Sequence, residues 1–521
     1  MGVNELQAKA NVVFINPSNS INLYQGLASK FAAIEPPTWA LLLAESVRSQ
    51  GHNVSIIDAN AESISDEALI QRIINLSPTL ICLVVYGQNV NAGTAGMSGA
   101  SRIARVLKAS NSNLKIGLIG SYVQSLPIKT LQDELEIDFG FTNEGVYALW
   151  NVLSLPKIDV GGLRNVKGIV FRDGNEIRIN KAEEVVPTAR MDLDLPGYAW
   201  DLLPFKERPL DLYRAPLWHA EYDEEKRSPY AALQSSLGCN FGCAFCMINI
   251  INRNDENPIG VASDYSRMRF WSPEFMIKQF DILAEMGIRT IRIVDEMFLL
   301  NRKYYVPLCE MLASRQYASE LRMWAYSRID TIANPEFLQL VRSAGIKWLA
   351  LGIESAERSV RLEISKGKFQ DVDIKKVVHQ VHHADIEVMA NFMVGLPGEN
   401  HALMQQTLDL SLELCTSGWN MYAAMALPGS ALYKQAVEKG YQLPDSYEGY
   451  SFHAYETIPM PTDYLTPAEV LLFRDQAFVK YHSNPEFLNR IEKKFGEKAV
   501  NNILDMLTVS LKRKIIEEML H

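Results

Sequence analysis

The sequence predicts an α/β protein built from a doubly wound parallel sheet, a partial barrel of six β/α units and a helical C-terminal region. Two observations lead to this prediction. Short apolar runs alternate with helical patterns through residues 1–155, and the alternation resumes with a longer period over residues 231–440. Strands that alternate with helices in this way pair in parallel. Residues 156–230 are expected to connect the two parts, and residues 441–521 turn irregular and then helical.

Buried strands alternate with helices in the first part of the chain. The expected strands occupy residues 11–16, 54–58, 80–86, 115–120 and 137–142. The helical pattern TWALLLAESVRSQG ends at Gly51, a residue type that favours the position after a helix. Ligands of doubly wound sheets bind beyond the carboxyl ends of the strands. The candidate binding loops therefore begin at Asn16, Asp58, Tyr86, Gly120 and Asn143.

The connector contains VKGIVFRDGNEIRIN, which predicts a β-hairpin because Asp173-Gly174 is a favoured two-residue turn. Six further strands are then expected at residues 231–237, 290–295, 321–327, 348–354, 388–394 and 420–426. Six such units fit a barrel or partial barrel better than an open sheet, and a barrel places its chemistry at the carboxyl ends of its strands. Ser272-Pro273 and the capping box Thr466-Pro467-Ala468-Glu469 signal helix starts.

Bulk composition limits the partners and the compartment. The chain has 521 residues, a formal net charge of −10 and a hydrophobic content of 48%. An acidic chain gives no electrostatic support for a nucleic-acid partner, and we expect none. The first residues lack the pattern of a signal peptide, and no apolar run approaches the ~18 residues that span a membrane. We therefore expect a cytoplasmic protein without a membrane partner, in a compartment where disulfides are rare.

Three of the six cysteines stand in one stretch, SSLGCNFGCAFCMIN, as Cys239, Cys243 and Cys246. Three interpretations compete. A structural zinc site needs a fourth ligand, and Cys309 and Cys415 are isolated within predicted helices. A redox pair explains Cys243 and Cys246 but leaves Cys239 without a role. An iron–sulfur cluster held by three thiolates leaves one iron open, as a catalytic centre requires.

The spacing Cys-x3-Cys-x2-Cys, with Phe245 before the last cysteine, resembles the signature of radical S-adenosylmethionine (SAM) enzymes. The signature follows a predicted first barrel strand, as it does in that superfamily. VDEMF (294–298), LGIES (351–355) and FMVGLPGE (392–399) end the second, fourth and fifth of these strands and match further landmarks. The resemblance implies a [4Fe-4S] cluster on the three cysteines, with SAM on the open iron. It places the SAM contacts at Phe245, Asp295, Glu296, Arg328, Glu354 and Ser355.

The residue types at these positions suit SAM, but each also has a structural alternative. Asp295 and Glu296 are expected near the amine of SAM, and Arg328 near its carboxylate. The alternative is salt bridging at the strand ends. Glu354 lies in an apolar run, where a carboxylate needs some partner whether or not SAM binds.

The N-terminal domain resembles the Rossmann-like cobalamin-binding domain of the cobalamin-dependent branch of radical SAM enzymes, the class B methylases. The stretch from YQGLASKF to SIIDAN resembles the start of that domain, and YGQNVNAGTAGMSGAS (86–101) resembles a later loop. The wider cobalamin-binding family uses D-x-H-x-x-G, whose histidine ligates cobalt. Here Asp58 is kept, but Asn60 and Ser63 replace the histidine and the glycine. Cobalt would therefore receive no histidine from this motif.

The resemblance implies cobalamin contacts at the carboxyl ends of the strands. The expected residues are Asn16, Asp58, Asn60, Tyr86, Gly87, Gln88, Gly120, Ser121, Asn143 and Glu144. Two alternatives remain. The glycines of Gly93-x2-Gly96-x2-Gly99 superficially suggest a nucleotide loop, although small residues at this interval usually mean close helix packing. The domain could also be purely structural.

The resemblance implies a cobalamin-dependent radical SAM methyltransferase. A 5′-deoxyadenosyl radical would activate an unactivated carbon, or less often a phosphorus, of a small molecule, and methylcobalamin would deliver the methyl group. A non-methylating cyclase or rearrangement enzyme would share every motif. An iron–sulfur electron carrier is a further alternative from a different class. The enzyme would need a reductant such as flavodoxin or ferredoxin, and no residue is assigned a catalytic role beyond cofactor binding.

Overall fold

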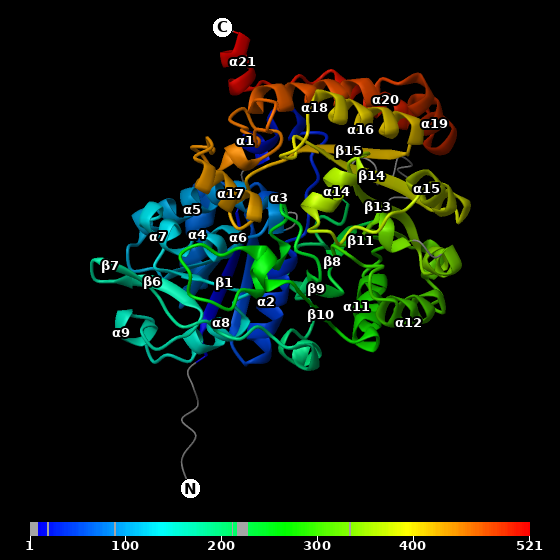
Figure 1. Ribbon diagram of the computed structural model, residues 1–521. Coiled ribbons are helices and arrows are strands. Elements are labelled where there is room, and N and C mark those ends of the chain that lie inside the picture. The colour runs from blue at the N-terminus through cyan, green and yellow to red at the C-terminus, as the bar shows by residue number, and fades with distance from the viewer. Residues whose placement is uncertain are drawn as a thin grey trace.

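The computed structural model describes residues 9–17, 20–87, 90–210, 212–215, 228–332 and 335–520. Figure 1 shows two α/β units, the first in blue to cyan and the second in green to yellow, with C-terminal helices in orange and red along one end of the second. In these described ranges, no helix combines the length and the apolar character needed to cross a membrane. The predicted α/β class is confirmed.

The first unit is a seven-stranded sheet with the order β2-β1-β3-β4-β5-β6-β7. Its parallel strands are β1 (Asn11–Asn16), β2 (Asn53–Asp58), β3 (Leu80–Val85), β4 (Ile116–Gly120) and β5 (Phe139–Phe141). The chain passes from β1 to β2 on one side and then to β3 on the other. The strand order therefore reverses between β1 and β3, which is where doubly wound sheets bind ligands.

Helices cover both faces of this sheet, as the predicted doubly wound fold requires. Val12 and Phe14 of β1 face α2 (Thr38–Ser49) and α8 (Val146–Leu153). Val13 and Ile15 face the opposite layer of α4 (Asp66–Leu76), α5 (Met97–Ser110) and α7 (Pro127–Asp133). The shorter helices are α1 (Ser20–Tyr24), α3 (Ala59–Glu62), α6 (Ser121–Ser125), α9 (Val160–Leu163) and α10 (Met191–Asp194).

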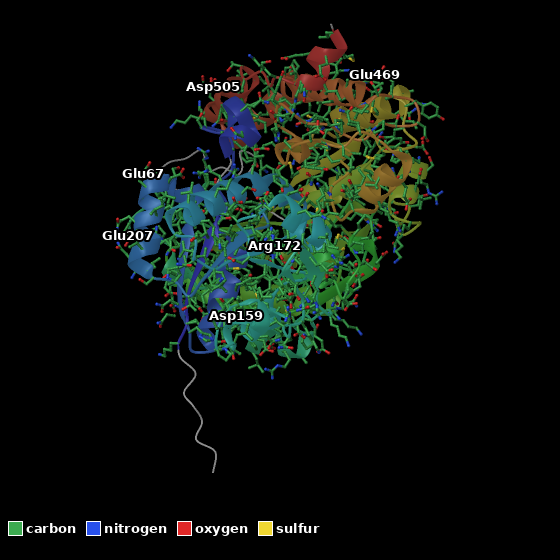
Figure 2. The ribbon with its side chains drawn as sticks, turned by 90° about the vertical axis from the view of Figure 1, so that its left-hand side faces the viewer. Glu67, Asp159, Arg172, Glu207, Glu469 and Asp505 are labelled. Carbon is green, nitrogen blue, oxygen red and sulfur yellow. The ribbon has the colours of Figure 1, made fainter. Side chains whose placement is uncertain are left out.

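The predicted hairpin forms, and it joins the first sheet. Its strands are β6 (Ile169–Asp173) and β7 (Glu176–Ile179), and Gly174 at the turn has a φ of +67°. β6 pairs antiparallel with β5, so that Phe139 lies opposite Phe171. Arg172, labelled in Figure 2 near the middle of this edge, donates to the carbonyl oxygens of Leu131, Glu134 and Ile137. The proposed division at residue 155 thus falls before two strands of the same sheet.

The second unit is a curled half-barrel of six parallel strands, ordered β15-β14-β13-β12-β11-β8, which confirms the predicted six-unit partial barrel. The strands are β8 (Tyr230–Leu233), β11 (Thr290–Ile293), β12 (Arg322–Arg328), β13 (Ile346–Glu354), β14 (Glu387–Val394) and β15 (Gly418–Ala423). The helices of this unit are α11 (Pro273–Glu285), α12 (Arg302–Ala313), α13 (Leu338–Ser343), α14 (Arg358–Ile364), α15 (Ile374–His383), α16 (His401–Leu414) and α17 (Ala431–Lys439).

The first predicted barrel strand, residues 231–237, is divided in two. β8 ends at Leu233, and a second strand, β9 (Ser236–Cys239), pairs antiparallel with β10 (Arg267–Phe270). The chain leaves the half-barrel sheet between them. Cys415, expected within a helix, instead follows α16 with a left-handed φ of +43°, whereas Cys309 lies inside α12 as expected.

The C-terminal helices are α18 (Pro467–His482), α19 (Pro485–Phe495), α20 (Glu497–Leu507) and α21 (Lys514–Leu520). The predicted capping box starts α18, because the Thr466 hydroxyl accepts from the backbone of Glu469 and the Glu469 carboxylate accepts in return. Trp348 of β13 stacks on Phe495 at 5.6 Å, and Trp419 of β15 stacks on Tyr481 at 4.9 Å. These helices therefore close the amino end of the half-barrel (Figure 1).

Candidate active site

The three cysteines of the predicted cluster lie on a loop that begins where β9 ends. Gly238 precedes Cys239 with a φ of +80°, and a Cβ atom there would lie 2.2 Å from the carbonyl oxygen of Arg267. The loop then turns back on itself, since the amides of Phe241 and Ile248 point to the sulfur atoms of Cys239 and Cys246 at 3.4 and 3.5 Å. Backbone amides aimed at sulfur suit thiolates that carry negative charge.

Burial raises the pKa of the Cys239 thiol to about 12 and that of Cys243 to about 11, and it raises the pKa of Cys246 well above its usual range. Without a cation these thiols stay protonated, whereas iron binding would remove their protons. Among the described residues, no three His, Cys, Asp or Glu side chains converge as ligands of a single metal ion. In a four-iron cluster each cysteine binds a different iron, so the three sulfur atoms need not converge on one point.

One large cavity adjoins this loop. Its volume is about 740 Å³, within the ~300–1,000 Å³ range of small-molecule sites. All three cysteines line it, together with the carboxyl ends of several barrel strands, the C-terminal helices, and residues 23, 24, 27, 31–33, 91, 92 and 95 of the first unit. The cavity therefore draws its wall from both α/β units.

Four of the six predicted SAM residues reach this cavity. They are Phe245, Glu296, Arg328 and Glu354. Burial raises the pKa of Glu296 and of Glu354 to about 7. Glu354 also has a left-handed φ of +66°, a conformation that costs energy for a residue with a side chain. Two carboxylates that burial disfavours in the ionised form would gain from a cationic ligand.

Arg328 is held in position on several sides. It pairs with Asp330 through two hydrogen bonds of 2.6 and 2.7 Å, and its guanidinium lies 3.9 Å from the ring centre of Phe241 and 4.5 Å from that of Phe369. Its Nη1 atom is buried and has no hydrogen-bond partner in the described structure. A fixed guanidinium with one unused donor suits an anionic group of a ligand.

Asp295 and Ser355, the other two predicted SAM residues, are buried and do not line the cavity. Asp295 accepts from the backbone and hydroxyl of Ser235 and from the hydroxyl of Ser236, at 2.5–2.7 Å. It thus holds the link between β8 and β9, ahead of the cysteine loop. Ser355 bonds Glu399 and Thr407 at 3.2 and 3.3 Å. Both residues occupy supporting positions.

The predicted cobalamin residues at β1 and β2 bond one another. Asn16 donates to Asp58 at 2.8 Å, and Tyr213 donates to the second carboxylate oxygen at 2.8 Å. Burial raises the pKa of Asp58 to about 6. Asp58 also caps α3, where Asn60 lies. This end of the sheet is therefore built around an internally bonded Asp58.

The predicted cobalamin residues at the ends of β3 and β4 have different surroundings. Tyr86 stacks on Trp39 at 5.0 Å, and together with Gly87 and Glu296 it lines a small hollow. Gly120 serves close packing, since a Cβ atom would lie 2.3 Å from the carbonyl oxygen of Val85. Ser121 is different, because its Oγ is buried without a partner. Gln88 lies outside the described residues.

Buried polar atoms without partners gather at this edge. Besides Ser121 Oγ, they are Thr94 Oγ1 and Gln124 Oε1, in the segments that follow β3 and β4. Buried polar atoms are normally hydrogen-bonded, and an exception marks a place for a ligand or water. The donors and acceptors here fit a group with polar side chains, such as cobalamin.

Asn143 and Glu144, at the end of β5, are used within the protein. Asn143 bonds the backbone of Gly145 and Glu183. Glu144 pairs with Arg269 of β10 at 2.6 Å, and both side chains are 1% exposed. Glu144 thus forms an ion pair that joins the first unit to the strand beside the cysteine loop, and its predicted contact with a cofactor stays a prediction.

Two contacts across the units were missed by the sequence analysis. Asn91 accepts from the backbone of Met247 at 2.9 Å and reaches Cys246 Sγ at 3.9 Å. Asn91 belongs to the loop 86–101 whose sequence resembles a cobalamin-domain loop, and its polar side chain in that loop was the available signal. Glu35 pairs with Arg292 of β11 at 2.7 Å. The two residues are 257 positions apart, and no local sequence pattern predicts such a pairing.

Two family models match the chain. Residues 24–153 match the B12 binding domain, and residues 233–411 match the radical SAM superfamily. The first range contains β2 to β5, and the second begins at the last residue of β8 and contains the cysteine loop and β11 to β14.

Two curated relatives and one solved structure match most of this chain. An uncharacterized methyltransferase of Pyrococcus horikoshii is 24% identical over 87% of this chain and 89% of its own length. The anaerobic magnesium-protoporphyrin IX monomethyl ester cyclase of Cereibacter sphaeroides is 23% identical over 88% of this chain and 68% of its own. Among solved structures, the radical SAM methyltransferase TsrM of Kitasatospora setae, with tryptophan and a SAM analogue bound, has a TM-score of 0.63. It is 14% identical, and the match covers 92% of this chain and 90% of TsrM.

Proposed function

This chain belongs to the cobalamin-dependent radical SAM enzymes, and from that premise we propose that it methylates an unactivated carbon, or less often a phosphorus, of a small-molecule substrate. The shared cavity carries this proposal. The cysteine loop of the half-barrel and Asn91, Ala92 and Ala95 of the B12-binding domain line the same space of about 740 Å³. A radical source on one domain and a methyl donor on the other need such a common space. The Pyrococcus horikoshii relative and TsrM are both named methyltransferases.

The cofactors of this family are a [4Fe-4S] cluster, SAM and cobalamin. When bound, they supply a radical and a transferable methyl group, while the protein orients the reactants and excludes water. Cys239, Cys243 and Cys246 would hold the cluster. The amides of Phe241 and Ile248 already point to two of these sulfur atoms.

For SAM, we propose three charged side chains as the main contacts. Glu296 and Glu354, whose pKa burial raises to about 7, would face the positive ammonium and sulfonium groups and recover their ionised form. Arg328 would use its free Nη1 to bind the carboxylate. Phe245, which also lines the cavity, would pack against the ligand.

For cobalamin, we propose the edge formed by the ends of β3 and β4. Thr94, Ser121 and Gln124 would donate to or accept from its polar side groups, because each has a buried atom without a partner. Asn60 occupies the motif position of the usual histidine, and it supplies no imidazole for cobalt. Cobalamin held at this edge would supply a transferable methyl group.

Anaerobic reconstitution tests the proposal. The wild type should bind about four irons per chain, and Cys239→Ala should retain less than one. Incubation with SAM and a reductant should release 5′-deoxyadenosine, and turnover of a substrate should release S-adenosylhomocysteine as well. Retention of all the iron by a variant that lacks all three cysteines would contradict the proposal.

A second candidate is a non-methylating cyclase with the same cofactors. It is favoured by the similarity to the protoporphyrin ester cyclase over 88% of this chain. Turnover that releases 5′-deoxyadenosine without S-adenosylhomocysteine would select it. For either reaction we propose flavodoxin or ferredoxin of the cytoplasm as the electron donor.

A further inference from the structure

The large cavity extends from the cysteine loop to helix α18, which packs on β15. β15 is the edge strand at the end of the half-barrel sheet opposite β8. We call the three α18 residues Arg474, Asp475 and Phe478, which all line the cavity, the α18 wall. Arg474 is fixed to the sheet, because its Nε donates to the carbonyl oxygen of Met421 on β15 at 3.0 Å.

The α18 wall holds more positive than negative charge. Arg513, which lies outside the cavity lining, donates from Nε and Nη2 to the two oxygens of Asp475, at 2.9 and 3.0 Å. Arg474 shares one of these oxygens, to which its Nη1 donates at 2.9 Å. Among the described residues, no other carboxylate pairs with either arginine. Two buried guanidinium groups therefore share a single carboxylate, and one positive charge has no counter-charge of its own.

Other titratable groups on this side of the cavity do not remove the excess. Arg292 has Glu35 as its own partner at 2.7 Å, so that pair is neutral. Burial, together with the charge of Arg474, lowers the pKa of His453 to about 3 and that of His482 to about 4. Both histidines are therefore uncharged. An excess charge buried in this way is costly unless a ligand supplies the opposite charge.

Arg474 also has an unused hydrogen-bond donor. Its Nε and Nη1 are engaged, whereas its Nη2 makes no hydrogen bond within the described part of the chain and is not enclosed by protein atoms. Since Arg474 lines the cavity, this donor is open to a ligand there. The hydroxyl of Tyr422, which follows Met421 on β15, lines the same cavity. A guanidinium group with a free N–H suits a planar carboxylate.

We propose that the substrate is an organic carboxylate whose carboxylate group pairs with Arg474. Its carbon skeleton would lie against the aromatic rings beside Arg474, those of Phe478 and Phe452. A single negative charge matches the single excess positive charge, so a carboxylate fits better than a doubly charged phosphate. That the bound molecule is the substrate rests on the proposed function, because the cysteine loop lines the same cavity. The class of ligand follows from the α18 wall alone.

Matched ligands test the proposal on the wild type. 4-Phenylbutanoate and 4-phenylbutanamide have nearly the same shape and differ in charge. Anaerobic calorimetry on the full chain, with cluster and cobalamin reconstituted and SAM present without reductant, would measure both affinities. The carboxylate should bind at least about tenfold more tightly than the amide. Equal affinities, or no saturable binding of the carboxylate, would overturn the proposal. Tighter binding of the doubly charged 3-phenylpropylphosphonate would also overturn it.

Variants of α18 locate the binding. Arg474→Gln leaves Arg513 and Asp475 as a closed neutral pair, so the variant should fold, and it should abolish the advantage of the carboxylate over the amide. Lys480→Gln removes an exposed cation from the same helix and should leave that advantage unaltered. If Arg474→Gln fails to fold, Arg474→Lys serves instead, and it should retain only part of the advantage. An undiminished advantage in the Arg474 variant would overturn the assignment.

Failure of this inference and failure of the proposed function give different results. Ligand binding needs no turnover, whereas release of 5′-deoxyadenosine needs no particular substrate class. A chain that cleaves SAM and binds the carboxylate and the amide equally would retain the proposed function and lose the inference. A chain that prefers the carboxylate through Arg474 and never cleaves SAM would do the reverse.

Discussion

The ion pair between Glu144 and Arg269 should be a main support of the cysteine loop, and Glu144→Gln should destabilise the protein. The carboxylate lies 2.6 Å from Arg269, and each side chain is 1% exposed. Arg269 also donates to the carbonyl of Val186 at 2.7 Å and to Asn252 at 3.2 Å. After the substitution, its charge would remain buried without an opposite charge.

Removing one partner of a buried pair costs about 3–5 kcal/mol. Glutamine keeps one acceptor for Arg269, so we expect the lower end, about 3 kcal/mol. At about 2–4 °C per kcal/mol for a unit of this size, the first thermal transition should fall by about 6–12 °C. Circular dichroism on the reconstituted protein would measure it. Because β10 pairs with β9, iron should also be lost at a lower temperature.

Two controls make this prediction sharp. Glu176→Gln changes an exposed carboxylate of β7 and should shift the transition by less than about 1 °C. The double variant Glu144→Gln with Arg269→Met removes both charges and should be more stable than Glu144→Gln alone. A Glu144→Gln protein that melts within about 1 °C of the wild type would refute the reasoning.

Three further predictions concern the site and the helix α18. Arg328→Lys should weaken SAM binding about tenfold, because lysine lacks the forked guanidinium. Calorimetry would measure the affinity for SAM, with the exposed Arg358→Lys as the control. An unchanged affinity in Arg328→Lys would count against the role assigned to Arg328. Asn91→Leu removes a hydrogen-bond donor near Cys246 Sγ, so it should lower the midpoint potential of the cluster. An anaerobic redox titration would measure this potential. The same potential in the variant and the wild type would show that Asn91 does not influence the cluster. Burial lowers the pKa of His482 to about 4, so the unfolded chain binds a proton that the folded chain does not. The free energy of unfolding should therefore fall as the pH falls from about 6.5 towards 4, by about 1.4 kcal/mol per pH unit. Urea titrations at several pH values would measure this dependence, and His482→Asn should weaken it. The same pH dependence in the variant and the wild type would contradict the prediction.

Much of the fold could be predicted because its strands are continuous apolar runs. The run LICLVV becomes β3 with every residue buried. The errors come from contacts that are distant in sequence. The local sequence does not show that β8 ends at Leu233. The strand ends there because the next segment, β9, pairs with β10 outside the half-barrel sheet. Equally, the predicted hairpin gave no sign that its partner would be β5.

The site shows the same division between local and distant information. The prediction for the cysteines depends on a spacing within eight positions, which the sequence displays in full. Several of the predicted cobalamin residues also bond partners within the protein, which their position at strand ends does not reveal. Glu144 accepts a hydrogen bond from Arg269, 125 positions further along the chain, and Asp58 accepts one from Tyr213, 155 positions further along. The unpaired atoms of Thr94 and Gln124 became visible only in three dimensions.

The attachment of the β6–β7 hairpin to β5 has a practical consequence for anyone who divides this chain. A fragment that stops near residue 155 would keep all the residues matched to the B12 binding domain and would still leave β5, only three residues long, as an open edge. Phe139 and Phe141, both fully buried in the whole chain, would lose their partners Phe171 and Ile169. Such edges promote aggregation. The segment that recognises a cofactor is therefore shorter than the segment that must be expressed to obtain it folded.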